Sequence, residues 1–175
     1  FYASCMALVQ RDGRSLFCFL FLSHSSLVFV GLETASDIGL AGALSMWLSV
    51  ALALTGFGLT LRSIETRTGP VDLNRYYGLV TPLPQLAGSF ILTGLASVGF
   101  PFTLGFFGSE MLIEAAVDVS PLVGFVVIIA SALNGIVVLK TYFHIFTGVP
   151  HQSTIEMGTM RSERIAIFTL TVLLI

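Results

Sequence analysis

The 175-residue chain is 55% hydrophobic and only 10% charged, with 15 Phe residues and a formal net charge of -2. Because soluble domains carry about 25% charged residues, this composition excludes a soluble globular protein and predicts a surface that faces lipid. There is no basic run with interleaved aromatic residues, so nucleic acid is not expected as a partner. The lipid bilayer is the first partner that the sequence implies.

Long apolar segments predict the membrane-spanning helices. A span needs about 20 mainly apolar residues, because the hydrocarbon layer is roughly 30 Å thick and each residue rises about 1.5 Å. Four segments reach that length, namely residues 15–32, 38–61, 83–107 and 121–146. Two shorter apolar runs, 1–9 and 165–175, are interpreted as parts of further helices cut at the chain ends. We expect an all-α transmembrane helix bundle, with residues 1–175 forming a single membrane domain fragment of a longer chain.

The basic residues test this layout independently. If every span crosses the bilayer, connections 10–14, 62–82 and 147–164 lie on one side, and connections 33–37 and 108–120 lie on the other. All eight basic residues fall in the first group of connections or in the adjoining helix end: Arg11, Arg14, Arg62, Arg67, Arg75, Lys140, Arg161 and Arg164. Since cytoplasmic loops carry an excess of Lys and Arg, we predict that this side is cytoplasmic.

A run of glycine and proline interrupts the third span. Gly99, Pro101, Gly105 and Gly108 fall close together near its end. Proline removes a backbone donor and clashes with the preceding turn, and glycine loosens the helix, so the run predicts one discontinuous helix. Broken helices in transporters often mark ion sites, but Gly and Pro are also common where membrane helices pack closely. Both interpretations stay open from the sequence.

Three ionisable residues within the predicted spans are candidates for a proton pathway. Burying such a side chain costs several kcal/mol unless it is paired or hydrated. His24 lies in the middle of its span, where it either bonds to a neighbouring helix or relays protons. Lys140 and His144 are four residues apart and share a helix face. They form a second relay candidate, unless Lys140 simply extends to the nearby membrane surface.

Glu110 is the fourth pathway candidate. It follows the predicted helix break and is spaced four residues from Glu114. The two glutamates either line an ion entrance or form a solvated outer turn, and the second interpretation is favoured for Glu114. Asn134, halfway along its span, is expected to form an interhelical hydrogen bond.

Motifs for soluble-enzyme chemistry are missing from the sequence. It has no glycine-rich phosphate loop, no paired His and Cys metal spacing and no nucleophile elbow. We therefore predict no cofactor, no metal site and no catalytic residue.

Taken together, these residues resemble the proton-conducting, antiporter-like membrane subunits of respiratory complex I (NADH:quinone oxidoreductase) and of Mrp-type cation/proton antiporters. The resemblance begins at the turn formed by Gln10, Asp12 and Arg14, which is similar to the family's Q-x-D-x-K/R pattern. It continues through the Ser23-His24 pair and is most specific over residues 99–110, similar to the family's G-x-P-x-T-x-G-F-x-G/S-K/E segment. The resemblance covers nearly the whole chain in order.

The sequence also departs from the family pattern. Arg14 stands where the family usually has Lys, and an arginine stays charged and cannot release a proton. Residues 46–52 contain neither the Lys nor the His that many members place there. The family's Lys or Glu at the helix break aligns with Ser109, so Glu110 would replace it only if the local register shifts by one.

The resemblance implies a proton-translocating integral membrane subunit in a bacterial inner membrane. It is not an enzyme alone, although it could belong to an NADH:quinone oxidoreductase. The implied partners are other membrane subunits and protons, with exchange for Na⁺ or K⁺ left open. Two rival functions also stay open. One is a non-conducting membrane scaffold, and the other is the membrane subunit of an ion-coupled inorganic-carbon uptake complex.

Overall fold

The computed structural model describes residues 1–149 and 161–174, and this part of the chain folds into α-helices. In chain order they are α1 (Tyr2–Val9), α2 (Gly13–Glu33), α3 (Asp37–Thr68), α4 (Pro84–Ser97), α5 (Leu104–Val119), α6 (Pro121–Phe146) and α7 (Arg161–Leu174). Among the described residues, extended pairing is limited to an isolated bridge between Asp12 and Asp72. The predicted all-α class is confirmed. Three of the described helices, α2, α3 and α6, are each long and apolar enough to cross a membrane.

The observed helix ends differ from the predicted spans in three places. Helix α3 continues to Thr68, beyond residue 61, and α7 begins at Arg161, before residue 165. Helix α5 runs through most of the predicted connection 108–120. Composition marks where lipid contact ends, whereas a helix continues as long as its charged residues have water or an ion-pair partner. The charged turns therefore looked like loops although they are helical.

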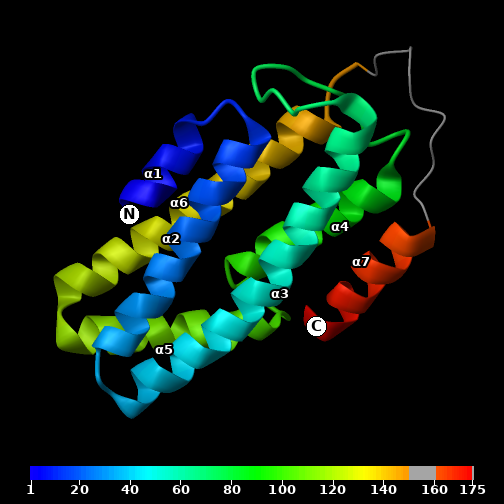
Figure 1. Ribbon diagram of the computed structural model, residues 1–175. Coiled ribbons are helices and arrows are strands. Elements are labelled where there is room, and N and C mark those ends of the chain that lie inside the picture. Colours follow the sequence, from blue (N-terminus) through cyan, green and yellow to red (C-terminus); the bar gives the residue numbers. More distant parts are fainter. Residues whose placement is uncertain (150–160, 175) are drawn as a thin grey trace.

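The connections gather at two opposite ends of the bundle (Figure 1). The α1–α2 turn, the loop between α3 and α4, and the end of α6 lie at one end, and the α2–α3 and α5–α6 turns lie at the other. Helix α3 occupies the centre, where it packs against α2, α4, α5 and α7. This arrangement agrees with the grouping of connections that the charges predicted.

Hydrogen bonds from loop 69–83 hold the arginine-rich end together. The N–H of Leu73 donates to the carbonyl of Arg11 at 2.7 Å, which ties the loop to the α1–α2 turn. The N–H groups of residues 77–80 donate to the carbonyls of residues 144–147 at 3.0 to 3.2 Å. The last carbonyls of a helix have no partner within the helix, so this loop satisfies the groups that α6 leaves unpaired.

Ion pairs join three helices at the same end. The Glu65 carboxylate, whose side chain is only 4% exposed, accepts from Nε of Arg14 at 3.0 Å to each oxygen. This bond connects the start of α2 to the end of α3. Arg67 on α3 pairs with Glu163 on α7 at 2.6 Å. A buried carboxylate without a partner would be strongly destabilising, so these arginines position the helix ends.

A buried aromatic cluster fixes α4 between α3 and α6. The ring of Phe90 on α4 lies 4.3 Å from that of Phe57 on α3, centroid to centroid, and 5.4 Å from that of Phe146 on α6. All three side chains are fully buried. Tilted and edge-on aromatic pairs at these distances are favourable beyond their buried area. The cluster therefore holds α4 against the core although α4 is short.

Helix α4 ends in a turn that Gly99 makes possible. Gly99 has φ of 81°, and the N–H groups of Gly99 and Phe100 donate to carbonyls in the last turn of α4 at 3.2 Å each. This pair of bonds is a Schellman motif, which a glycine in the left-handed region closes. Pro101 follows and cannot continue the helix. The interruption is thus a complete stop, not a kink.

The predicted span 83–107 is consequently two helices. Helix α5 begins at Leu104 and packs directly against the backbone of α3. A side chain at Gly108 would place its Cβ 2.8 Å from the backbone nitrogen of Met46, so only glycine allows this approach. The predicted discontinuous helix is present. Its second half, α5, lies in close contact with α3.

Candidate functional site

A chain of buried hydrogen bonds joins α1, α2 and α6. The hydroxyls of Ser4 and Ser23 lie 2.7 Å apart, and the Ser23 hydroxyl donates to Oδ1 of Asn134 at 2.9 Å. All three side chains are at most 1% exposed. Since the Ser23 proton is directed at Asn134, Ser4 is the donor in the other bond. Asn134 forms the expected interhelical bond, but its Nδ2 has no hydrogen-bond partner.

His24 follows Ser23 on α2 and is also buried, with 1% of its surface exposed. Its Nδ1 lies 2.8 Å from the carbonyl of Leu20, so this nitrogen carries a proton and donates. Its Nε2 has no hydrogen-bond partner. The backbone carbonyl of Ser97, in the last turn of α4, faces the ring. A proton taken up at Nε2 would therefore have an acceptor close by.

Ser49 on α3 also lies beside the end of α4. Its hydroxyl is fully buried and has no hydrogen-bond partner. A Cβ on Gly105, in the first turn of α5, would lie 2.6 Å from this hydroxyl and 3.0 Å from the carbonyl of Ala96. Gly105 therefore leaves the space in which the Ser49 hydroxyl and the end of α4 meet.

Unpartnered polar atoms of His24 and Ser49 thus lie beside the last turn of α4, and that of Asn134 lies on α6, which packs against α4. Ala96 lies toward Ser49 on α3, and the Ser97 carbonyl faces His24 on α2. Val98 lies beside Gly135, next to Asn134 on α6. We call the side chains of His24, Ser49 and Asn134 the polar centre. Buried polar atoms are normally hydrogen-bonded, so unpartnered atoms beside a helix break mark a candidate functional site.

Lys140 and His144 continue a polar line along the seam between α1 and α6. Nζ of Lys140 donates to the carbonyl of Leu8 at 2.7 Å. Lys140 lies about 9 Å along α6 from Asn134, toward the arginine-rich end. Nδ1 of His144 lies 2.8 Å from the carbonyl of Lys140, and its ring stacks on Tyr76 with centroids 4.8 Å apart. Lys140 is thus half-buried, with its ammonium held by the last turn of α1.

Glu110 lies outside this polar centre. Glu110 and Glu114 are both exposed on α5. The residue that packs against the break is Ser109, whose hydroxyl lies against Gly99. Ser109 is also the position that the family resemblance aligns with the Lys or Glu of the break. The structure therefore brings His24 to the centre, places Lys140 and His144 along one seam, and leaves Glu110 on the surface of the described chain.

The turn formed by Gln10, Asp12 and Arg14 stabilises the start of α2. Nε2 of Gln10 donates to the carbonyl of Met6 at 3.1 Å, and Asp12 caps α2 by accepting from the N–H of Ser15 at 2.9 Å. Arg14 is held by Glu65, a residue that sequence reasoning missed. These contacts fix the start of α2, and hence the height of His24 in the bundle.

Beside this turn, Asn74 orders the loop that follows α3. Its backbone N–H donates to the Asp72 carboxylate, and so does its side-chain amide. The two bonds, the backbone one more strongly, lower the pKa of the Asp72 carboxyl below its ordinary value.

In residues 1–149 and 161–174, no group of three His, Cys, Asp or Glu side chains is placed to hold a metal ion.

Comparison with known proteins agrees with the sequence resemblance. A family model described as "NADH:quinone oxidoreductase/Mrp antiporter, TM" matches residues 1–134. NADH-quinone oxidoreductase subunit M from Rickettsia prowazekii is 26% identical over 147 residues, which are 84% of this chain and 30% of that protein. The chain therefore spans less than a third of the length of this relative.

Solved structures match over most of the chain. A chain of respiratory complex I from Thermus thermophilus with bound NADH has a TM-score of 0.88 at 23% identity, covering 98% of this chain and 36% of its own length. A chain of the Mrp complex from Dietzia sp. has a TM-score of 0.83 at 25% identity, covering 90% of this chain and 30% of its own length. At this level of identity the first match shows the fold alone.

The family match covers most of the chain, and the fold match covers nearly all of it. The membership predicted from the ordered motifs is confirmed, and with it a multi-pass integral membrane protein. This chain belongs to the NADH:quinone oxidoreductase/Mrp antiporter family as an antiporter-like membrane subunit.

Proposed function

We propose that this chain is part of a proton-conducting subunit in an energy-coupling membrane complex of the complex I or Mrp type. The observation that carries the proposal is the polar centre. His24, Ser49 and Asn134, on α2, α3 and α6, each have a buried polar atom without a protein hydrogen-bond partner. A purely structural core would leave these atoms paired or would replace them with apolar groups.

Water is the partner that the polar centre suits best. A buried water typically makes two to four hydrogen bonds to otherwise unsatisfied groups. The unpaired atoms of His24, Ser49 and Asn134, together with the nearby carbonyls of Ala96 and Ser97, supply donors and acceptors for such waters. Hydration would also lower the cost of a charge at this depth, which is several kcal/mol for an unpaired ion.

His24 is the group that would carry the proton. Its Nδ1 already donates to Leu20, so a proton arriving from water would bind at Nε2. The resulting imidazolium would donate toward the Ser97 carbonyl or toward water, and would release the proton to water on the other side of the break. Histidine suits this step because its ordinary pKa lies close to neutral pH.

The seam between α1 and α6 gives a route from the centre to the arginine-rich end. The bonded chain of Ser4, Ser23 and Asn134 begins the route, and Lys140 and His144 continue it. One of the three Lys140 N–H groups is held by the Leu8 carbonyl, and this bond fixes where Nζ can deliver a proton. Movement of α1 relative to α6 would therefore shift Nζ of Lys140 within this part of the route.

A non-conducting scaffold is the second candidate function. It is favoured by two observations: Lys140 is held by a backbone carbonyl, and residues 46–52 of α3 supply no Lys or His. The two functions make opposite predictions for proton flux. An ion-coupled inorganic-carbon uptake complex would use the same conducting site and differ in its soluble partner.

Other membrane subunits are the proposed partners, and Na⁺ or K⁺ remains open as a counter-ion. We also propose a bacterial inner membrane, with the arginine-rich end in the cytoplasm. The hydrogen bonds that gather the three basic connections at one end support this orientation, because cytoplasmic loops are rich in Lys and Arg.

Replacing His24 with Leu tests the proposed relay. His24→Leu keeps a similar volume but removes the proton-binding nitrogen, so proton flux through the full-length subunit in vesicles should fall at least about tenfold, or about 1.4 kcal/mol on the barrier. Ser26→Ala is the matched control, because the Ser26 hydroxyl is exposed on the same helix and bonds only to the Leu22 carbonyl. Equal flux in both variants, at equal abundance, would remove His24 from the relay, and absence of flux in the parent protein would support the scaffold.

Glu110 and Glu114 form a matched pair for the proposed entrance. Both are exposed on α5, but Glu110 lies one turn nearer the break. If Glu110 receives protons for the relay, Glu110→Gln should slow flux about tenfold, while Glu114→Gln should have almost no effect. Subunit abundance is measured alongside. Identical flux in the two variants would place Glu110 among ordinary surface residues.

Cysteine labelling tests the orientation. In a variant whose Cys5 and Cys18 are replaced by Ser, a cysteine at Arg75 should react with an impermeant reagent only from the cytoplasmic face. A cysteine at Asp118, at the opposite end of the bundle, should react only from the outside. Both positions are exposed. Reaction of both from one face contradicts the two-ended layout, and reversed sidedness contradicts the orientation.

A further inference from the structure

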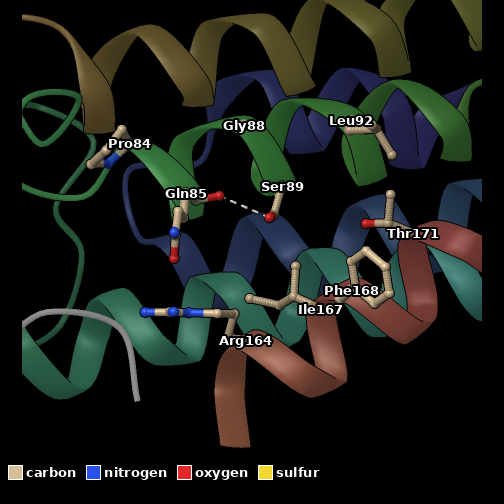
Figure 2. Close-up of a pocket in the computed structure, with 9 residues that line it drawn as sticks. All are labelled: Pro84, Gln85, Gly88, Ser89, Leu92, Arg164, Ile167, Phe168 and Thr171. Carbon is tan, nitrogen blue, oxygen red and sulfur yellow. Dashed lines mark hydrogen bonds between the residues drawn. The ribbon is translucent and has the colours of Figure 1, made fainter. Parts of the chain in front are cut away.

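A groove of about 430 Å³ lies between α4 and α7, away from the polar centre (Figure 2). Helix α4 supplies Gly88, Ser89 and Leu92, and helix α7 supplies Ile167 and Phe168. Figure 2 shows these two sets of side chains facing each other across the groove. The groove is therefore a lengthwise opening between two helices of a membrane protein.

The middle of this groove is apolar. A Cβ at Gly88 would meet no heavy atom within 4 Å, so the absence of a side chain there leaves the wall of the groove open. The Ser89 hydroxyl donates to the Gln85 carbonyl one turn earlier, at 2.8 Å, and so its donor is satisfied within α4. Leu92 on α4 and Phe168 on α7 line the two walls of the groove, so the groove offers an apolar surface to an occupant.

One end of the groove is positively charged. Arg164 lies at the end where α4 begins, beside Pro84 and Gln85 (Figure 2). Arg164 is exposed, and the adjacent carboxylate, Glu163, is held by Arg67 at 2.6 Å. No carboxylate in the described part of the chain pairs with Arg164. This end also lies at the arginine-rich end of the bundle.

We propose that the groove binds one anionic phospholipid. Its phosphate would contact Arg164, and an acyl chain would run between α4 and α7 past Gly88 toward Phe168. From residue 84 to residue 92 helix α4 rises about 12 Å, which is within the reach of an acyl chain. Basic pockets between membrane helices bind acidic lipid head groups by this combination of charge and apolar contact.

The size of the groove is compatible with a lipid acyl chain. Its volume, about 430 Å³, falls in the range of small-molecule sites, roughly 300–1,000 Å³. A single acyl chain enters between the walls.

A photocrosslinker placed inside the groove tests the proposal. In the full-length protein with Cys5 and Cys18 replaced by Ser, Gly88→Cys would carry a maleimide-benzophenone group, which the open space at this position accommodates. The protein is placed in vesicles of equal parts phosphatidylglycerol and phosphatidylcholine with the same acyl chains. Phosphatidylglycerol should be crosslinked about fivefold more often than phosphatidylcholine, equivalent to about 1 kcal/mol for one basic residue.

Two arginine variants locate the charge that selects the lipid. Arg164→Gln should reduce the crosslinking ratio to that of the vesicle, whereas Arg11→Gln, which changes another exposed arginine at the same end, should leave the fivefold preference intact. Thermal unfolding of each variant is compared with its parent, so that a loss of structure is recognised. The proposal is overturned by crosslinks to another protein segment in place of lipid, by an unselective ratio, or by a preference that survives Arg164→Gln.

Discussion

A helix that stops inside a membrane protein cannot leave its backbone groups facing lipid, and the end of α4 shows how this chain meets that constraint. Gly99 and Phe100 return their N–H groups to the last turn of α4, and Pro101 prevents the helix from continuing. The turn leaves carbonyls of the last residues directed at the surrounding helices. The polar atoms of His24 and Ser49 lie beside this end of α4, so the proposed site depends on the stop.

The rest of the bundle keeps this stop in one position. Helix α5 resumes directly against α3 because Gly108 permits backbone contact with Met46. The aromatic cluster centred on Phe90 holds α4 in the core. At the arginine-rich end, loop 69–83 supplies donors for the last carbonyls of α6. A break that is fixed on all sides can present unpaired polar atoms without the helices fraying around it.

The sequence predicts some of these features well because local chemistry decides them. Helix α6 has the predicted ends, since Pro121 begins it, and the break follows from Gly99 and Pro101. The course of α5 beyond residue 107 was missed, because charged residues on one exposed face of a helix resemble a loop. Ser49 and Glu65 were missed because their importance depends on which helix faces meet. Small hydroxyls and ion pairs acquire partners only in the folded bundle.

The central claim is that the space around the end of α4 holds water that serves His24. A high-resolution experimental structure of the full-length subunit in a lipid environment, resolving ordered waters, tests it most directly. The account predicts a water within about 3.2 Å of Nε2 of His24, and further waters at the Ser49 hydroxyl and at Nδ2 of Asn134. A dry centre, in which these three atoms bond to protein groups or face only carbon, would contradict it.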